Sequence, residues 1–283
     1  MLVKEILLAS EISRSGLDAP TYASFAGIMT GFAFAGLTVY LERQERKSKE
    51  EKEKIRAFQV VAALFYAMSS LAICAFLYSS LAGESDPGRA LVAALIYGPV
   101  LGMAVLSLFY SMTLMMFEHN VTEKATRYAY QVVVYFGPAL VIRFLASHSH
   151  SAYQDQCKFS EKSVSQSCET TTLLWIGFIS IVVILILSLV ITRVATAGTG
   201  ILHKFRDFIA HRPASPSLFT FFITATVAIF SLFISTLNSG TIPDLVAHFT
   251  LIIGSFLMAS FAFLCGCVLN RRIQKIRERK QLS

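Results

Sequence analysis

Few residues in this chain could do chemistry inside a membrane, because its long apolar stretches hold almost no ionisable side chains. No Asp or Glu lies in the middle of any such stretch, and Arg143 stands about one turn from the end of its own stretch. A guanidinium at that depth can snorkel to the headgroups; the alternatives are a site for an external anion or a buried ion pair. Paired carboxylates and a His-x-x-x-His helix are missing, so the sequence predicts a protein that is not an enzyme and has no cofactor and no intramembrane metal.

Two groups of polar residues border the apolar stretches. Asp244 and His248 are one turn apart, and His148 and His150 open a polar loop. If the two groups meet, they could bind a divalent metal or respond to pH, because imidazole changes charge near neutrality. The simpler interpretation is that Asp244 caps a helix after Pro243.

Polar side chains also recur along four apolar stretches, on one face of each predicted helix. They could line a narrow aqueous path, but hydroxyl groups are equally the usual contacts between membrane helices. The path candidates are Gln59, Tyr66 and Ser70; Tyr128, Gln131, Tyr135 and Arg143; Thr220, Thr224, Ser231, Ser235 and Asn238; and His248 and Ser255.

Two Gly-Pro pairs interrupt apolar stretches, in Tyr97-Gly98-Pro99 and in Phe136-Gly137-Pro138. An interior proline removes one helical hydrogen bond and frees a carbonyl one turn earlier. Broken helices at corresponding depths can mark a transporter site. Proline kinks without such a role are also common in membrane helices.

Composition identifies the elements that carry these residues. Charged residues make up 15% of the chain and apolar residues 54%, and several runs exceed the roughly 18 residues that indicate a membrane span. We therefore predict an all-α, polytopic membrane protein with a bundle of about seven transmembrane helices. The predicted spans are 22–41, 58–81, 90–117, 128–147, 171–192, 217–237 and 244–268, with 1–21 as a short amphipathic segment, a break at Asp18–Pro20, and 269–283 as a basic tail.

The basic residues predict the orientation. One alternate set of loops holds 19 of the 25 Lys and Arg residues, the other set holds 5, and Arg143 is the remaining one. Positive charge favours the cytoplasmic side, which puts the N-terminus outside and the C-terminus inside, in a cell or inner membrane. The basic tail should bind anionic inner-leaflet lipids. The segment 201–212 is predicted to form an interfacial helix, and the linker 42–57 is predicted to extend the helices on either side of it. We expect no nucleic-acid partner.

Cysteines and small residues complete the pattern. Cys157 and Cys168 share an outer loop, where they either form a disulfide or remain two thiols. Cys265 and Cys267 are expected to be packing residues, with palmitoylation as the alternative. Small residues four apart let membrane helices approach closely; here they are Ala23, Gly27, Gly31 and Ala35, with Gly98 and Gly102 in the third span. Three partners are possible for the helix face with Ala23, Gly27, Gly31 and Ala35. They are another helix of this chain, a second copy in a homo-oligomer, or another membrane protein.

These features leave two hypotheses for function. The first is a permeation or transport protein for an ion or small solute, using the polar path. The alternative is a membrane sensor or an accessory or assembly subunit that acts through helix packing.

Overall fold

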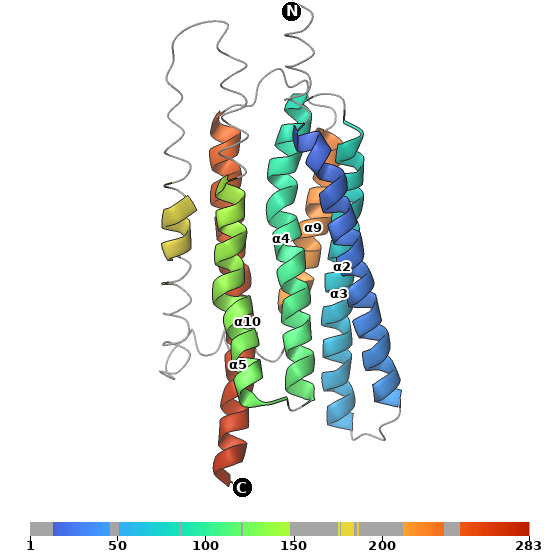
Figure 1. The fold of residues 1–283 in the computed structure, drawn as a ribbon. Helices are drawn as coiled ribbons and strands as arrows, with labels where there is room; N and C mark the ends of the chain where they lie inside the picture. Colours follow the sequence, from blue (N-terminus) through green and yellow to red (C-terminus); the bar gives the residue numbers. More distant parts are fainter. Residues whose placement is uncertain are drawn as a thin grey trace, which may run out of the picture.

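The computed structural model describes residues 14–45, 51–84, 87–119, 121–147, 175, 177–183, 186, 212–234 and 244–282. Within these ranges the chain is all-helical and contains no strand (Figure 1). The helices are α2 (Arg14–Glu45), α3 (Glu51–Ala82), α4 (Pro87–Glu118), α5 (Glu123–Gln131), the π-helix η1 (Val132–Phe136), α9 (Ser215–Ile234) and α10 (Asp244–Leu282). Residues 137–147 continue η1 as an α-helix.

Five of the described helices are long and apolar enough to cross a membrane. They are Asp18–Glu42, Ala57–Ala82, Val92–Glu118, Lys124–Ser147 and Phe249–Gln274. These five match predicted spans, so the multi-pass character of the chain has structural support. The apolar part of α9, Ser215–Ser231, is shorter. Of the predicted span 171–192, only 175, 177–183 and 186 are described, and all of these are helical.

The expected break at Pro20 is wrong. Helix α2 begins at Arg14 and runs through Pro20 without interruption. Only about two turns precede this proline, so its missing N–H removes a single bond near the helix end, where few bonds have formed. The expected helical extensions of the linker are confirmed at its two described ends, because α2 reaches Glu45 and α3 starts at Glu51.

Local chemistry explains the tight turn between α3 and α4. Gly83 and Glu84 donate their backbone N–H groups to the carbonyls of Ser80 and Leu81 and so end α3. Helix α4 then begins at Pro87, a position where the missing N–H costs nothing. Arg89 and Glu84 form an ion pair of 3.3 Å across the turn.

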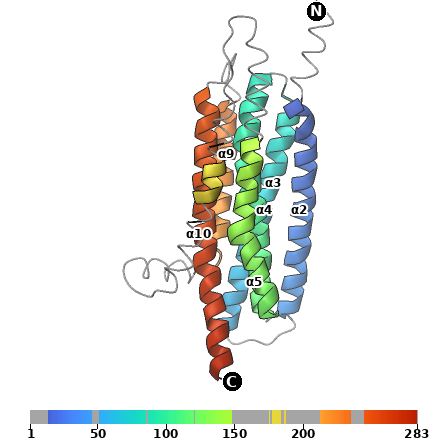
Figure 2. The same ribbon diagram turned by 60° about the vertical axis from the view of Figure 1, so that its left-hand side comes forward.

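Helix α4 is the centre of the bundle and α2 is its periphery. In the apolar 18-residue segment of α4, 72% of the residues are buried, whereas in that of α2 only 22% are buried. Figure 1 shows α2 beside α3 on one side of α4, α10 beside α5 on the other side, and α9 behind α4. Figure 2 keeps α2 and α10 at opposite edges after the turn of the view.

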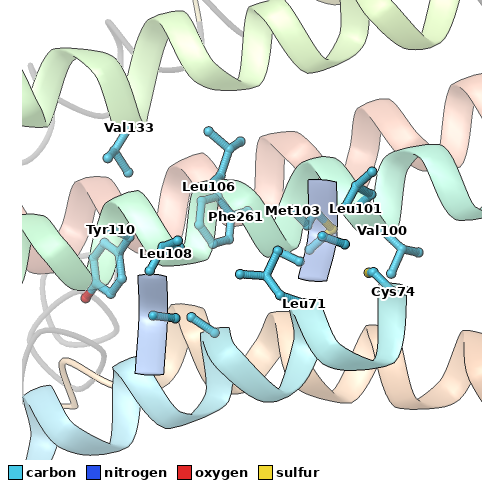
Figure 3. Packing of buried hydrophobic residues seen from close by; sticks show 14 of the residues in the cluster. Leu71, Cys74, Val100, Leu101, Met103, Leu106, Leu108, Tyr110, Val133 and Phe261 are labelled. Carbon is cyan, nitrogen blue, oxygen red and sulfur yellow. The ribbon is translucent and has the colours of Figure 1, made fainter. Parts of the chain in front are cut away.

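The apolar core surrounds α4. In Figure 3, Leu71 and Cys74 of α3 face Val100 and Met103 of α4, with Phe261 of α10 nearby. All five side chains are buried, none more than 2% exposed. The core therefore joins helices that are far apart in sequence, and α4 contacts α2, α3, α5, α9 and α10.

The helix ends alternate between the two ends of the bundle. The described ends at Glu45, Glu51, Glu118 and Leu282 lie together at the lower end in Figure 1, and Ala82, Pro87 and Asp244 lie at the upper end. The described ends of the basic linker and the basic tail thus lie at one end of the bundle.

Candidate functional site

Helix α4 and the segment 137–147 pack against each other through glycine. In this antiparallel pair each contact joins a small residue to a large one, in steps of four along both helices. The facing pairs are Gly98 with Leu145, Gly102 with Val141, and Leu106 with Gly137. A Cβ on Gly98 would lie 3.8 Å from Leu145, an ordinary contact, whereas a Cβ on Gly102 or Gly137 would overlap the facing side chain. Gly98 and Gly102, both predicted packing residues, therefore lie in a helix–helix contact.

The second Gly-Pro pair follows the π-helix. Gly137 donates its N–H to Val132 O, five residues earlier, so the turn is wider than an α-turn. Pro138 has no N–H to donate, and the wide turn absorbs this defect directly before it. Helix α10 packs beside the first Gly-Pro pair, because a Cβ on Gly254 would lie 2.7 Å from Leu145 and 3.2 Å from Pro99.

The small residues of α2 face the other way. Gly27, Gly31 and Gly36 have no atom within 4 Å of an added Cβ among the residues that the structure describes. Ala35 is exposed and Ala23 half-buried. We call Ala23, Gly27, Gly31 and Ala35 the open glycine face.

A different series of residues holds α2 to its neighbours. Ala19, Ala26, Ala33 and Tyr40, seven residues apart, are buried, each at 1% exposure or less. Sequence reasoning missed this series, although its regular spacing was a readable signal.

Three predicted path residues are buried on α3 and α9, which pack against each other and against α4. Ser70, Thr220 and Thr224 are fully buried. Each hydroxyl donates to a carbonyl one turn earlier: Ser70 to Tyr66 O at 2.8 Å, Thr220 to Pro216 O at 3.1 Å, and Thr224 to Thr220 O at 2.8 Å. Their protons are therefore used within their own helices, and their lone pairs remain to accept further bonds.

Helix α4 adds hydroxyls that sequence reasoning missed. Ser107 and Ser111 are fully buried, and Ser111 Oγ lies 3.3 Å from Ser217 Oγ of α9. Tyr110 donates its hydroxyl to Pro213 O at 2.6 Å. The one-turn spacing of Ser107 and Ser111 is the same signal that identified the other stripes. We call Ser70, Ser107, Ser111, Ser217, Thr220 and Thr224 the hydroxyl seam.

Other path candidates border this seam. The Tyr66 and Phe221 rings lie 5.7 Å apart, and Gln59 is half-buried. Ser231 donates to Ala228 O at 2.6 Å and is also hydrogen-bonded to Tyr97. The stripes of α3 and α9 therefore meet along α4.

The stripe of the fourth span does not join them. Tyr128 is 66% exposed, Arg143 is exposed and Gln131 half-buried. The Tyr135 ring packs on Tyr130 at 5.8 Å.

The remaining candidates are partly or wholly outside the described residues. Ser255 Oγ of α10 is buried without a partner in the described ranges, and the side chain of His248 is not described. Outside the described residues lie Ser235, Asn238, Cys157, Cys168, His148 and His150.

The end that charge predicts to be cytoplasmic contains an ion pair between two helices. Arg272 of α10 donates to Glu118 of α4 at 2.7 Å, with both side chains less than a quarter exposed. Cys265 and Cys267 are buried thiols, as expected for packing residues. Across the described ranges, no group of His, Cys, Asp and Glu could hold a metal ion.

No protein-family model matches the chain, and no curated protein or solved structure is similar to it.

Proposed function

We propose that this chain is a non-catalytic multi-pass membrane protein that assembles with a second copy of itself through the open glycine face of α2. One observation carries the proposal: Gly27 and Gly31 have open space above them, whereas Gly102, Gly137 and Gly254 are filled by neighbouring side chains. A glycine that contacts no described residue of its own chain gains nothing there from the close approach that it permits.

The energetics favour an external partner. A helical glycine costs roughly 0.5–1 kcal/mol relative to alanine. Inside the bundle, close helix packing offsets that cost. On α2 the offset has to come from a helix outside the described fold, and small residues four apart are the usual surface for such contacts in lipid.

The shape of the face suits a second copy. Phe34, 59% exposed, and Ile28, 60% exposed, flank Gly31 on its two sides. A two-fold interface brings the same surface of both copies together, so Phe34 and Ile28 of one copy can pack beside the glycines of the other.

The first test is the size of the protein in lipid nanodiscs, measured by native mass spectrometry. Gly27→Leu with Gly31→Leu should fill the groove and convert an assembled species into single copies. Ala72→Leu, on the exposed side of α3, is the matched control and should leave assembly intact. An unchanged oligomer in the double variant contradicts the proposal.

We also propose that the end carrying the basic linker and tail is cytoplasmic, where the tail meets anionic lipids. Asn120-Val121-Thr122 is a glycosylation sequon, and its described residues Val121 and Thr122 follow α4 at this end. Expression in a eukaryotic host should give no glycan there. A glycosylated Asn120 reverses the orientation.

Permeation is the second candidate, and the interrupted fourth span favours it. π-Turns inside membrane helices often lie at functional sites, and here η1 is followed by Gly137-Pro138 opposite α4. Purified protein in liposomes should then release trapped K⁺, Cl⁻ or glycerol faster than empty liposomes do. Equal rates for all three solutes exclude this role.

A further inference from the structure

Ser107 differs from the other hydroxyls of the seam. It is fully buried at the centre of α4, and its Oγ has no hydrogen-bond partner among the described residues. Ser70, Ser111 and Thr224 all donate to a carbonyl of their own helix. A buried hydroxyl left without a partner costs about 1–3 kcal/mol, so the position of Ser107 needs a physical account.

The register of α4 and α9 places Ser107 beside α9. Ser111 faces Ser217, and Tyr97 faces Ser231. These contacts are 14 residues apart on each helix, so the two helices run antiparallel in constant register. One turn from the Ser111–Ser217 contact, toward Tyr97, α4 presents Ser107.

At the same level α9 presents Thr220, since it lies one turn beyond Ser217. The contact between the Tyr66 and Phe221 rings brings α3 to this level as well. Ser70 follows Tyr66 by one turn, as Thr224 follows Thr220. Three helices therefore direct hydroxyl-bearing turns to the region around Ser107.

The proton balance of the seam defines what could bind there. A hydroxyl has one proton and two lone pairs. The Ser111 proton is bonded to Ser107 O at 2.8 Å, so Ser217 is the donor in their contact. Thr220 and Thr224 have also used their protons but keep acceptor capacity. Among the six seam hydroxyls, only Ser107 has a proton with no acceptor in the described residues.

We propose that the hydroxyl seam around Ser107 is a binding site for a small uncharged hydrogen-bonding molecule, in the first place water. The molecule accepts the Ser107 proton and donates to lone pairs of the neighbouring hydroxyls. No ionisable side chain belongs to the seam, which disfavours a charged ligand. Buried waters typically make about three hydrogen bonds to such groups. This site is independent of the proposed assembly through α2.

The competing account is that the Ser107 hydroxyl turns to the carbonyl of Met103, one turn earlier, as other helical serines do. In that case the seam is dry. Side chains near Ser107 have no contact with bulk water. The first account predicts that water lies beside them, and the second predicts that none does.

Radiolytic footprinting in heavy-oxygen water distinguishes them, using the full chain in nanodiscs. Tyr110 is fully buried and lies three residues from Ser107, on the same side of α4. Phe261 is equally buried and stands at the depth of Leu106, because each lies seven residues past the contact between Pro99 and Gly254. It is the matched aromatic control away from the seam.

A wet seam predicts heavy-oxygen incorporation at Tyr110 well above that at Phe261. Ser107→Ala should lower incorporation at Tyr110 roughly threefold by removing one of the water's partners, and Ser107→Thr, which keeps the hydroxyl, should restore it. Equal background incorporation at Tyr110 and Phe261 in the native chain overturns the proposal without any variant. So does an unchanged Tyr110 signal in Ser107→Ala.

Discussion

The glycines of α2 and those of the contact between α4 and 137–147 occupy opposite environments. Gly102 and Gly137 lie where a single added carbon would collide with Val141 or Leu106, while Gly27 and Gly31 face open space. Both sets have the small residues that membrane helices use for close approach. The difference shows that spacing identifies a contact surface but not its partner, which is inside the chain in one case and outside it in our proposal.

The largest expected effect is at Gly137. Gly137→Ala should destabilise the fold by about 1–3 kcal/mol, because the new methyl group overlaps Leu106 and lies 2.9 Å from Val132 O. Thermal unfolding followed with a thiol-reactive dye measures this, since Cys74 and Cys265 are buried in the folded protein. Gly98→Ala, with 3.8 Å of room, is the control in the same contact and should be nearly neutral. Equal losses of stability in both variants would mean that the close contact at Gly137 does not cause the destabilisation.

A smaller effect is expected where α10 joins α4 at the end of the bundle. Arg272 and Glu118 are 17% and 23% exposed, so solvent partly screens their attraction. We expect a coupling of about 1 kcal/mol. A double-mutant cycle of Arg272→Ala and Glu118→Ala, followed by the same unfolding assay, isolates it. Additive single effects would show that the pair contributes nothing.

The smallest effect has the opposite sign. Gly27→Ala meets no atom within 4 Å in the described fold, so a single copy should gain about 0.5–1 kcal/mol from the better helix former. Unfolding should be measured at high dilution in detergent, where copies are separated. A clear loss of stability in the single copy would place a contact of this chain over Gly27.

Hydrophobic length alone predicted five helices of the bundle well, because a membrane span requires a long apolar run whatever its neighbours are. Periodicity placed Thr220 and Thr224 on one helix face, and both are buried. It did not specify where a face points, so the exposure of Gly27 could not be predicted. Ser107 and Ser111 were not predicted because two hydroxyls one turn apart in the strongly apolar third span form too short a series to define a polar face. The π-turn before Pro138 depends on how Gly137 meets Leu106, which no local sequence pattern specifies.

The most direct test of the central claim is a cross-link between copies at the open glycine face. Gly31→Cys should be made in a chain whose five native cysteines are replaced by alanine, and oxidised in membranes. A disulfide needs Cα atoms within about 7 Å, so assembly through α2 predicts a covalent dimer from Gly31→Cys and none from Ala72→Cys on the exposed side of α3. A monomer in both cases, or equal dimer in both, contradicts assembly through this face.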